Sequence, residues 1–210
     1  TAALDDLCRR LHGRPLCVIP GPEEMEVLPR YQHVEADPWA AASACREQGG
    51  KVLWVSNTVK RATQIADEAA TRAWPAARYH SHYRYLDRLS RHKEVIEAFK
   101  SPSHAFASTT QVAEMSLDLS ADLLVTDLAP VPAMIQRLGR LNRKAVQGTL
   151  PAPFIVLEPD CTLPYSPKQL QESKEWLARL GTSPLTQRDL ILAWTQDEEP
   201  PVRGGSYWLD

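Results

Sequence analysis

The block from Phe106 to Arg143 constrains the fold of this chain most, because short apolar runs alternate in it with polar turns. The first run ends in three hydroxyl residues at 108–110, and the second, Leu123–Asp127, has the pattern of a buried strand. Pro130 and Pro132 then mark the turn into a segment that carries three arginines. Hydroxyls at one strand end, a carboxylate (Asp118) beyond them and arginines after the next strand are typical of the carboxyl edge of a parallel sheet, where ligands usually bind. We therefore expect an α/β domain with a ligand site at that edge.

The arginine segment, residues 136–143, reads QRLGRLNR. On a helix, Arg137, Arg140 and the side of Gln136 would point roughly one way, and Arg143 would continue the row one turn further on. Taken alone, such a row is a solvated basic face. The hydroxyls and the carboxylate that precede it favour another interpretation, because guanidinium forks match phosphate oxygens and keep their charge at any relevant pH. We expect the row to face an anionic ligand.

A second buried-strand pattern, Lys51–Ser56, is followed by Asn57 and Thr58 and then by a helical pattern to about Arg72. Strand, polar turn and helix make half of a βαβ unit, which again predicts parallel strands. Asn57 and Thr58 would stand at the carboxyl end of this strand. For Thr58, capping of the helix N-terminus is an equally good explanation, and the two roles are compatible.

The remaining elements follow from shorter patterns. We expect an edge strand at 31–35, strands at 76–80 and 154–157, and helices at 39–48, 167–180 and 186–194, with a further helix ending at Lys100. Residues 1–11 read as a helix, and an acidic loop is expected up to Pro29.

Composition excludes several classes of protein. With 24 basic and 26 acidic residues the chain is ordinary for a soluble domain, and no apolar run approaches the ~20 residues of a membrane helix. We therefore expect no contact with membranes. The four cysteines are scattered without a C-x-x-C pair, which favours a cytoplasmic protein. Residues 51–150 carry 14 Lys and Arg against 9 Asp and Glu, which is weakly consistent with a phosphate-binding surface.

Two motifs in the block resemble a known family. Residues 136–143 match Q-R-x-G-R-x-x-R at every fixed position, and the pattern Q-x-x-E-x-S-L-D is matched by Gln111, Glu114, Ser116, Leu117 and Asp118. These resemble motifs VI and V of superfamily 2 helicases, which lie in the second of two RecA-like lobes. The residues of the two motifs are most similar to those of the CRISPR-associated helicase–nuclease of type I systems. Residues 51–62 resemble motif IV, so the resemblance covers roughly residues 51–143.

The resemblance implies roles for individual residues. Arg140 and Arg143 would face the γ-phosphate of ATP, Arg137 would bridge toward acidic residues of the first lobe, and Asp118 would sit near the ribose or the lobe interface. Gln136 joins this nucleotide-binding set. The nucleic-acid track would consist of Asn57, Thr58, Arg88, Ser108, Thr109, Thr110 and Gln111. Family members carry H-S-R-F followed by D-R near the start of this track; here His82 and Tyr83 replace the arginine and phenylalanine, and Arg88 keeps its place.

The same resemblance implies the organisation of the chain. Residues 31–160 would form the RecA-like lobe, a doubly wound, mostly parallel sheet with helices on both faces. Residues 1–30 would be the segment that connects it to the first lobe, and residues 161–210 a small, mostly helical appendage.

Several motifs of a complete helicase–nuclease are missing from this sequence. It contains no G-x-x-x-x-G-K-[ST] loop, no strand that ends in Asp-Glu to hold magnesium, and no His-Asp pair of the family's nuclease domain. His80 and His82 have no further ligand at metal spacing, so no metal site is expected. ATP with magnesium would therefore bind between this lobe and a first RecA-like lobe, and we expect this chain alone to be inactive.

By the resemblance, the complete enzyme would be an ATP-driven translocase on single-stranded DNA, recruited by a guide-RNA effector complex. The first lobe and the nuclease domain would be its partners, in the same or a separate polypeptide. Two alternatives stay open: the second lobe of another superfamily 2 helicase, acting on RNA or in DNA repair, and a catalytically silent docking lobe.

Overall fold

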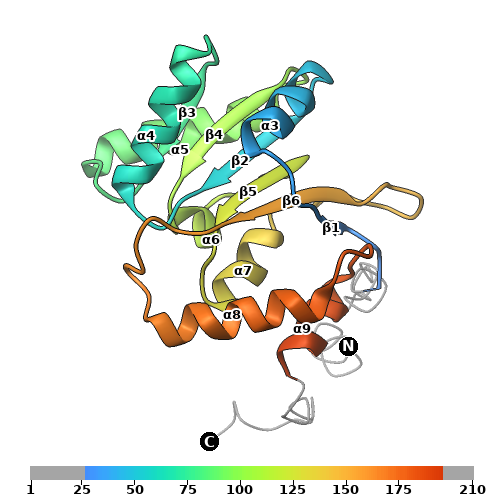
Figure 1. Cartoon of the computed structure of the whole chain (residues 1–210). Helices are drawn as coiled ribbons and strands as arrows, with labels where there is room; N and C mark the ends of the chain where they lie inside the picture. The colour runs from blue at the N-terminus through green and yellow to red at the C-terminus, as the bar shows by residue number, and fades with distance from the viewer. Residues whose placement is uncertain (1–26, 196–210) are drawn as a thin grey trace, which may run out of the picture.

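The computed structural model describes residues 27–195, and the helix and loop expected before Val27 lie mostly outside them. The strands are β1 (Tyr31–His33), β2 (Lys51–Val55), β3 (Ala76–Tyr79), β4 (Ala105–Thr109), β5 (Leu123–Asp127) and β6 (Ala152–Leu157) (Figure 1). The helices are α3 (Pro38–Glu47), α4 (Val59–Thr71), α5 (Tyr85–Lys100), α6 (Val112–Ser116), α7 (Val131–Leu138), α8 (Pro167–Leu180) and α9 (Gln187–Trp194). Among these helices none is long and apolar enough to cross a bilayer.

The six strands form one sheet in the order β1-β6-β5-β2-β4-β3. Every strand pair in it is parallel, as the alternation of buried strands and helices predicts. The predicted α/β class is thus confirmed, with β1 at one edge as expected. The carboxyl ends of all six strands consequently lie at one edge of the sheet, and their amino ends at the other.

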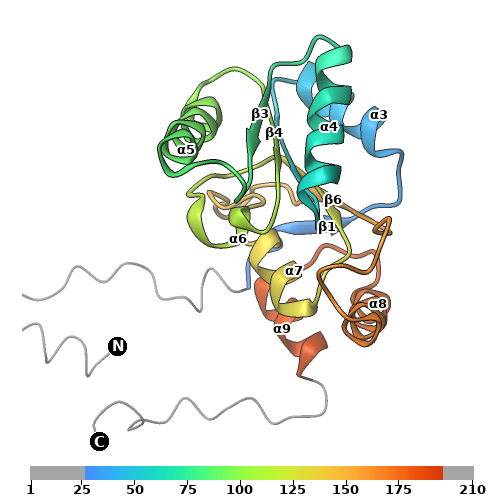
Figure 2. The ribbon, with the colours of Figure 1, turned by 90° about the vertical axis from the view of Figure 1, so that its left-hand side faces the viewer.

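Each face of the sheet is covered by its own hydrophobic cluster. On one face Trp54 and Phe106 pack with Trp39 of α3 and Ile65 of α4. On the other face the alternate strand residues, such as Leu53, pack with α5, α6, α7 and α8. Figure 2 shows α5 on one side of the sheet and α3 and α4 on the opposite side. Helices on both faces explain why the strands read as continuous apolar runs rather than alternating ones.

The predicted row of arginines on one helix is wrong. Helix α7 ends at Leu138, and the chain then turns so that Ala121 and Leu141 form an isolated parallel bridge. In this bridge Ala121 donates its N–H to the carbonyl of Arg140, and Asn142 donates to the carbonyl of Ala121. Because these backbone groups pair across the fold, they cannot continue the helical i to i−4 ladder. Arg140 and Arg143 therefore lie in the turns after α7, away from the face of Arg137.

Helices α8 and α9 belong to the same core as the sheet. Trp176 of α8 is fully buried in the cluster under α7, and its indole N–H donates to the carbonyl of Leu190 at 3.0 Å. Leu185 pairs with Tyr31 of β1, so the segment between the two helices is tied to the sheet. The boundary predicted at residue 160 stays an expectation.

The central strands should dominate stability. Leu124 of β5 is 0% exposed in the larger cluster, so Leu124→Ala should lower the free energy of unfolding of the full chain by about 2–5 kcal/mol. Leu150, which is 84% exposed, is the matched control, and Leu150→Ala should change stability by less than about 0.5 kcal/mol. Urea unfolding followed by circular dichroism measures both. Equal effects of the two substitutions would contradict this description of the core.

Candidate functional site

The first of the three motif arginines, Arg137, lies inside the domain. Its side chain is 0% exposed, although it starts near the end of an amphipathic helix. Its guanidinium donates to side-chain oxygens of Glu114 (2.9 Å), Thr126 (2.9 Å), Asn57 (3.2 Å) and Tyr165 (3.3 Å) and to the carbonyl of Asp127 (2.9 Å). All three guanidinium nitrogens are thus occupied by this domain. We call Arg137 and these five partners the arginine hub.

Asn57 stands opposite Arg137 at the carboxyl end of β2. Its amide nitrogen donates to the carbonyl of Leu128 at 2.8 Å, while its amide oxygen accepts from Arg137. Its backbone carbonyl accepts from the Gln111 side chain at 2.9 Å. The side chain is 4% exposed. Asn57 therefore joins β2, β5 and α7 from within, and its burial keeps the amide away from a nucleic-acid backbone in this arrangement.

Asp127 supplies the negative charge at the end of β5. Its carboxylate accepts from the backbone N–H of Asn57 at 2.8 Å and lies 2.9 Å from Nε of Arg61. Those two atoms are poorly aligned, since each is buried without a hydrogen bond, so the contact is an ion pair only. Burial raises the pKa of the Asp127 carboxyl, against the lowering effect of the Asn57 N–H, Arg61 and Arg137. Arg61 also pairs with Asp160, which ties α4 to the segment after β6.

The polar residues predicted for the nucleic-acid track do gather at the carboxyl edge, but most lie below the surface. Ser108, Thr109 and Thr110 are each at most 1% exposed. The Ser108 hydroxyl donates to the carbonyl of Ala62 at 2.7 Å, and the Thr109 hydroxyl is buried without a partner among the described residues. Thr58 caps α4 by accepting from the N–H of Arg61, so its capping role is confirmed.

Asp118 and Arg143 lie near the opposite edge of the sheet, and the prediction that they share the carboxyl edge is wrong. Asp122, just before β5, exchanges hydrogen bonds with Lys51, the first residue of β2. Arg143 is anchored in the same region, since its backbone N–H donates to the Ser120 hydroxyl at 3.0 Å. The cause is the direction of α7: it starts at the carboxyl edge and runs back across the sheet, so the residues after it arrive at the amino edge.

Arg140 is half-buried between the two edges. Its guanidinium donates to the carbonyls of Ala113 (3.2 Å) and Glu114 (2.6 Å) in α6. Burial lowers the pKa of Arg140, and the neighbouring Arg143 lowers it further, while Asp118 opposes them. Arg140 thus binds backbone carbonyls near the end of a short helix, where they commonly lack intrahelical partners, and this is a structural use of a motif arginine.

Arg143 differs from the other two motif arginines because its guanidinium is on the surface. The side chain is 44% exposed and pairs with Asp118, which is 89% exposed. Both border a cavity of about 230 Å³ that Lys100, Lys144, Ser120, Phe99 and Leu119 also line. Three cationic side chains against one carboxylate give this cavity a positive balance that suits an anion.

The other two predicted residues lie apart from these groups. Gln136 is exposed on α7, and Arg88 is partly exposed on α5 with its guanidinium 5.9 Å from the centre of the Tyr85 ring.

Sequence reasoning missed several residues of the hub and its surroundings. Tyr165 reaches Arg137 from the segment before α8, and no pattern in the sequence marks it. Arg30, placed in the connecting segment, donates to the carbonyls of Leu141 (3.2 Å) and Asn142 (3.3 Å) and so supports the turn before Arg143. Asp127 could have been found, because a carboxylate at the end of a buried strand needs a partner.

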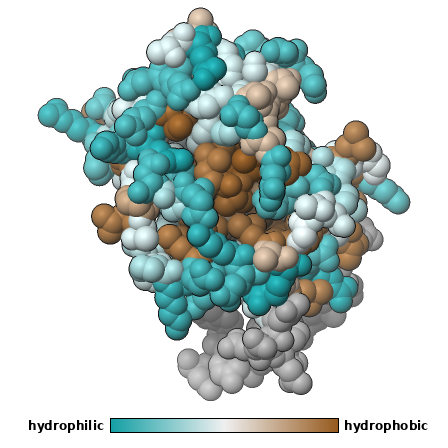
Figure 3. All heavy atoms as spheres, in the orientation of Figure 1, coloured by the Kyte–Doolittle hydropathy of each residue, from teal (hydrophilic) through white to brown (hydrophobic). Residues whose placement is uncertain are grey.

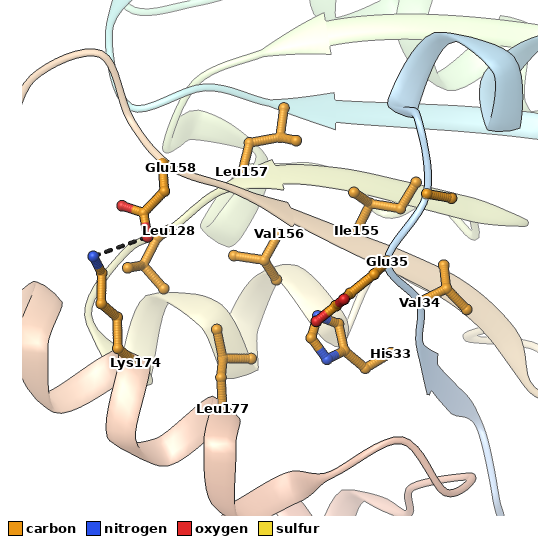
Figure 4. Close-up of a pocket in the computed structure, with 11 residues that line it drawn as sticks. His33, Val34, Glu35, Leu128, Ile155, Val156, Leu157, Glu158, Lys174 and Leu177 are labelled. Carbon is orange, nitrogen blue, oxygen red and sulfur yellow. Dashed lines mark ion pairs between the residues drawn. The ribbon is translucent and has the colours of Figure 1, made fainter.

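A second cavity lies between the β1–β6 edge and α8. Apolar surface gathers near the centre of the face in Figure 3, and Figure 4 shows Leu177 of α8 facing Val156 of β6 in a cavity of about 360 Å³. Lys174 and Glu158 pair at 2.8 Å at its rim. No residue of the predicted site lines it. Across residues 27–195 no cluster of three or more His, Cys, Asp or Glu side chains could hold a metal ion.

The arginine hub predicts that Arg137 and Arg143 contribute very differently to stability. Arg137→Lys keeps the charge but leaves several buried acceptors unpaired, so it should lower the free energy of unfolding of the full chain by about 2–5 kcal/mol. Arg143→Lys is the matched control and should cost about 0–1 kcal/mol, because its pair is exposed. Denaturant unfolding measures both, and a silent Arg137→Lys would refute the hub.

The comparisons with known proteins agree with this geometry. Residues 48–146 match the family model "CRISPR-associated nuclease/helicase Cas3, C-terminal". The chain is 53% identical over 213 residues to a putative CRISPR-associated nuclease/helicase Cas3 of Myxococcus xanthus (strain DK1622), which covers 99% of the chain and 28% of the relative. It spans less than a third of the length of the curated relatives it matches.

Two solved structures share the fold. One is described as T. fusca Cas3-ATP, with a TM-score of 0.67 and 22% identity over 90% of this chain and 25% of that one. The other, a "CRISPR RNA-guided surveillance complex, pre-nicking", has a TM-score of 0.61 and 19% identity over 89% and 26% of the two chains. The chain thus carries the second RecA-like lobe of a superfamily 2 helicase, of the kind found in the C-terminal region of Cas3.

Proposed function

We propose that this lobe supplies an arginine finger and part of the nucleic-acid track to an ATP-dependent single-stranded-DNA translocase of type I CRISPR interference. One observation carries the proposal: Arg143 is held by its backbone while its guanidinium stays on the surface. Arg137 and Arg140 are committed to contacts within the domain, so of the three motif arginines Arg143 is the one able to reach a ligand from another lobe.

The surroundings of Arg143 support a role toward phosphate. Lys100 and Lys144 border the same cavity, and Arg143 donates to the Asp118 carboxylate there. The family resemblance implies that both Arg140 and Arg143 face the γ-phosphate. In this proposal Arg140 acts only indirectly, because its guanidinium holds α6 in place by donating to its carbonyls. Exchange of the Asp118 contact for a phosphate would cost little, since the Arg143–Asp118 pair is exposed and worth about 0–1 kcal/mol.

The groups around this cavity suit the phosphates of a nucleotide but not the magnesium ion that accompanies them. Arg143, Lys100 and Lys144 suit phosphate oxygens, and ATP bound against them would supply the phosphoryl group whose transfer drives movement. The magnesium ion does not fit here, because the described residues gather no set of oxygen ligands for it. The proposal therefore assigns the phosphate loop and the metal ligands to a first RecA-like lobe.

The partners of the complete protein follow from its relatives. They are described as nuclease/helicases, and one related chain is part of an RNA-guided surveillance complex. We propose that this chain likewise works beside a nuclease domain and is recruited by a guide-RNA effector complex in the cytoplasm. A docking lobe without catalytic function is the alternative that the experiments below exclude or support.

This chain alone should not hydrolyse ATP. Its sequence lacks a phosphate loop, and phosphoryl transfer needs charge stabilisation from both sides of the nucleotide. Release of phosphate from radiolabelled ATP by the purified chain, with and without single-stranded DNA, should equal the buffer background. Turnover that grows in proportion to this protein, and is unchanged by further purification, would overturn the assignment of the nucleotide loop to another lobe.

Arg143→Lys in the complete, two-lobed protein should abolish most DNA-stimulated ATP hydrolysis. Lysine keeps the charge but loses the planar fork and its reach, and an arginine finger is worth about 10³ to 10⁵ in rate in related NTPases. The affinity for nucleotide should change little. Single-turnover hydrolysis beside equilibrium nucleotide binding separates the two effects.

The control is Arg188→Lys, at an exposed arginine on α9 outside the proposed site, which should hydrolyse ATP at the wild-type rate. Because Arg143→Lys is expected to fold normally, a lost rate cannot be attributed to a lost structure. Wild-type turnover in Arg143→Lys would end the arginine-finger assignment and favour the docking lobe.

A further inference from the structure

The start of α5 exposes an unusual set of side chains. Tyr85 is 65% exposed, Leu86 76% and Leu89 45%, although they lie within five consecutive positions. A helix turn that serves only to cover a sheet would turn such residues inward. Here Val95 and Phe99, further along α5, make the contacts with the core. The first two turns therefore expose apolar and aromatic surface.

The same region is strongly basic. Residues 78–93 contain five Arg and Lys side chains and three histidines against one acidic residue, Asp87. Faces that pack against protein are generally depleted of charge at their centre, whereas single-stranded nucleic acid is bound by cationic grooves with interspersed aromatic rings. The charge balance therefore favours a polyanion over a protein surface.

The rings and guanidinium groups are already arranged against one another. His80 and Tyr83 stack with centroids 4.2 Å apart and ring planes 9° from parallel. Arg91 lies 5.7 Å from the Tyr83 ring centre, and Arg88 lies 5.9 Å from that of Tyr85. Burial, with help from His82 and Arg78, lowers the pKa of His80, so a neutral imidazole supports the stack at neutral pH. The loop before α5 is thereby held in place while the Tyr85 ring stays exposed.

The region adjoins the edge where the predicted track gathers. His80 follows the last residue of β3, and the carbonyl of Tyr79 accepts a hydrogen bond of 3.4 Å from the N–H of Thr110. Since all strands are parallel, this is the carboxyl edge that also holds Asn57 and Gln111. Those residues are mostly buried, so a strand lying along this edge needs a surface contact from elsewhere.

We propose that Tyr85, flanked by Arg88 and by the Tyr83–Arg91 pair, is a stacking platform for a base of single-stranded DNA at the carboxyl edge of this lobe. Leu86 and Leu89 extend the apolar surface on which the sugar and base rest. The proposal depends on the proposed function, because it names the part of the lobe that contacts the translocated strand. The bound chemistry is a nucleobase, whose flat face stacks on an aromatic ring.

The test uses the complete protein and two single-stranded oligonucleotides of equal length, one of deoxythymidine and one with abasic sites throughout. Wild type should bind the first more tightly. Tyr85→Ala should weaken binding of the deoxythymidine strand about 5- to 100-fold, the range of base–aromatic stacking, and leave binding of the abasic strand nearly unchanged. Tyr85→Phe, which keeps the ring, should bind both strands as wild type does. Fluorescence anisotropy at fixed salt gives these affinities.

Trp194→Ala is the matched control, since Trp194 is an aromatic side chain 49% exposed on α9 and should not affect either affinity. Unchanged binding of deoxythymidine by Tyr85→Ala would overturn the platform while leaving Arg143 and the proposed function standing. If Tyr85→Ala instead lowers only the melting temperature of the complete protein, this face packs against another domain and the platform is again overturned. Wild type that binds neither strand would refute the proposed function itself.

Discussion

The buried guanidinium of Arg137 is the interaction on which the arrangement of the site depends. A charged group excluded from water is tolerated only if its donors are satisfied, and here it bonds to five residues from four different segments. The guanidinium therefore fixes the ends of β2 and β5 relative to α6, α7 and the segment before α8. A planar fork with several donors suits this task, because it can satisfy acceptors in several directions at once.

From that fixed centre the motif residues divide between the two edges of the sheet. Asn57, Thr110 and Gln111 lie at the carboxyl edge, where Asn57 belongs to the hub and Gln111 donates to its carbonyl, while Asp118 and Arg143 lie near the amino edge with Lys100 and Lys144. Helix α7 and the turn after it connect the two regions. Arg140 attaches this turn to α6 by donating to the carbonyl of Glu114. A change in the position of α7 would thus alter both edges, which is what the proposed link between nucleotide and nucleic acid requires.

Most of the fold could be predicted because its signals are local. Continuous apolar runs such as Leu123–Asp127 and helix caps such as Thr58 depend on neighbours in sequence, and both appear where they were expected. The set of motif residues was predictable for a similar reason, since the residue types and spacings at 111–118 and 136–143 are themselves the signal. The family to which they point agrees with the matched model over residues 48–146.

The sequence by itself determined the parallel α/β architecture, the helicase-type motifs and the absence of a phosphate loop from this chain. Only the tertiary structure decided which arginine is buried and which is exposed. A helical repeat places Arg137, Arg140 and Arg143 on one face, but the pairing of Ala121 with Leu141 ends the helix first. Likewise, hydroxyls at 108–110 read as exposed ligands, yet the packing of α4 and α5 on β4 buries them. Long-range backbone pairing and burial set these outcomes, and neither is visible in the spacing of residues along the chain.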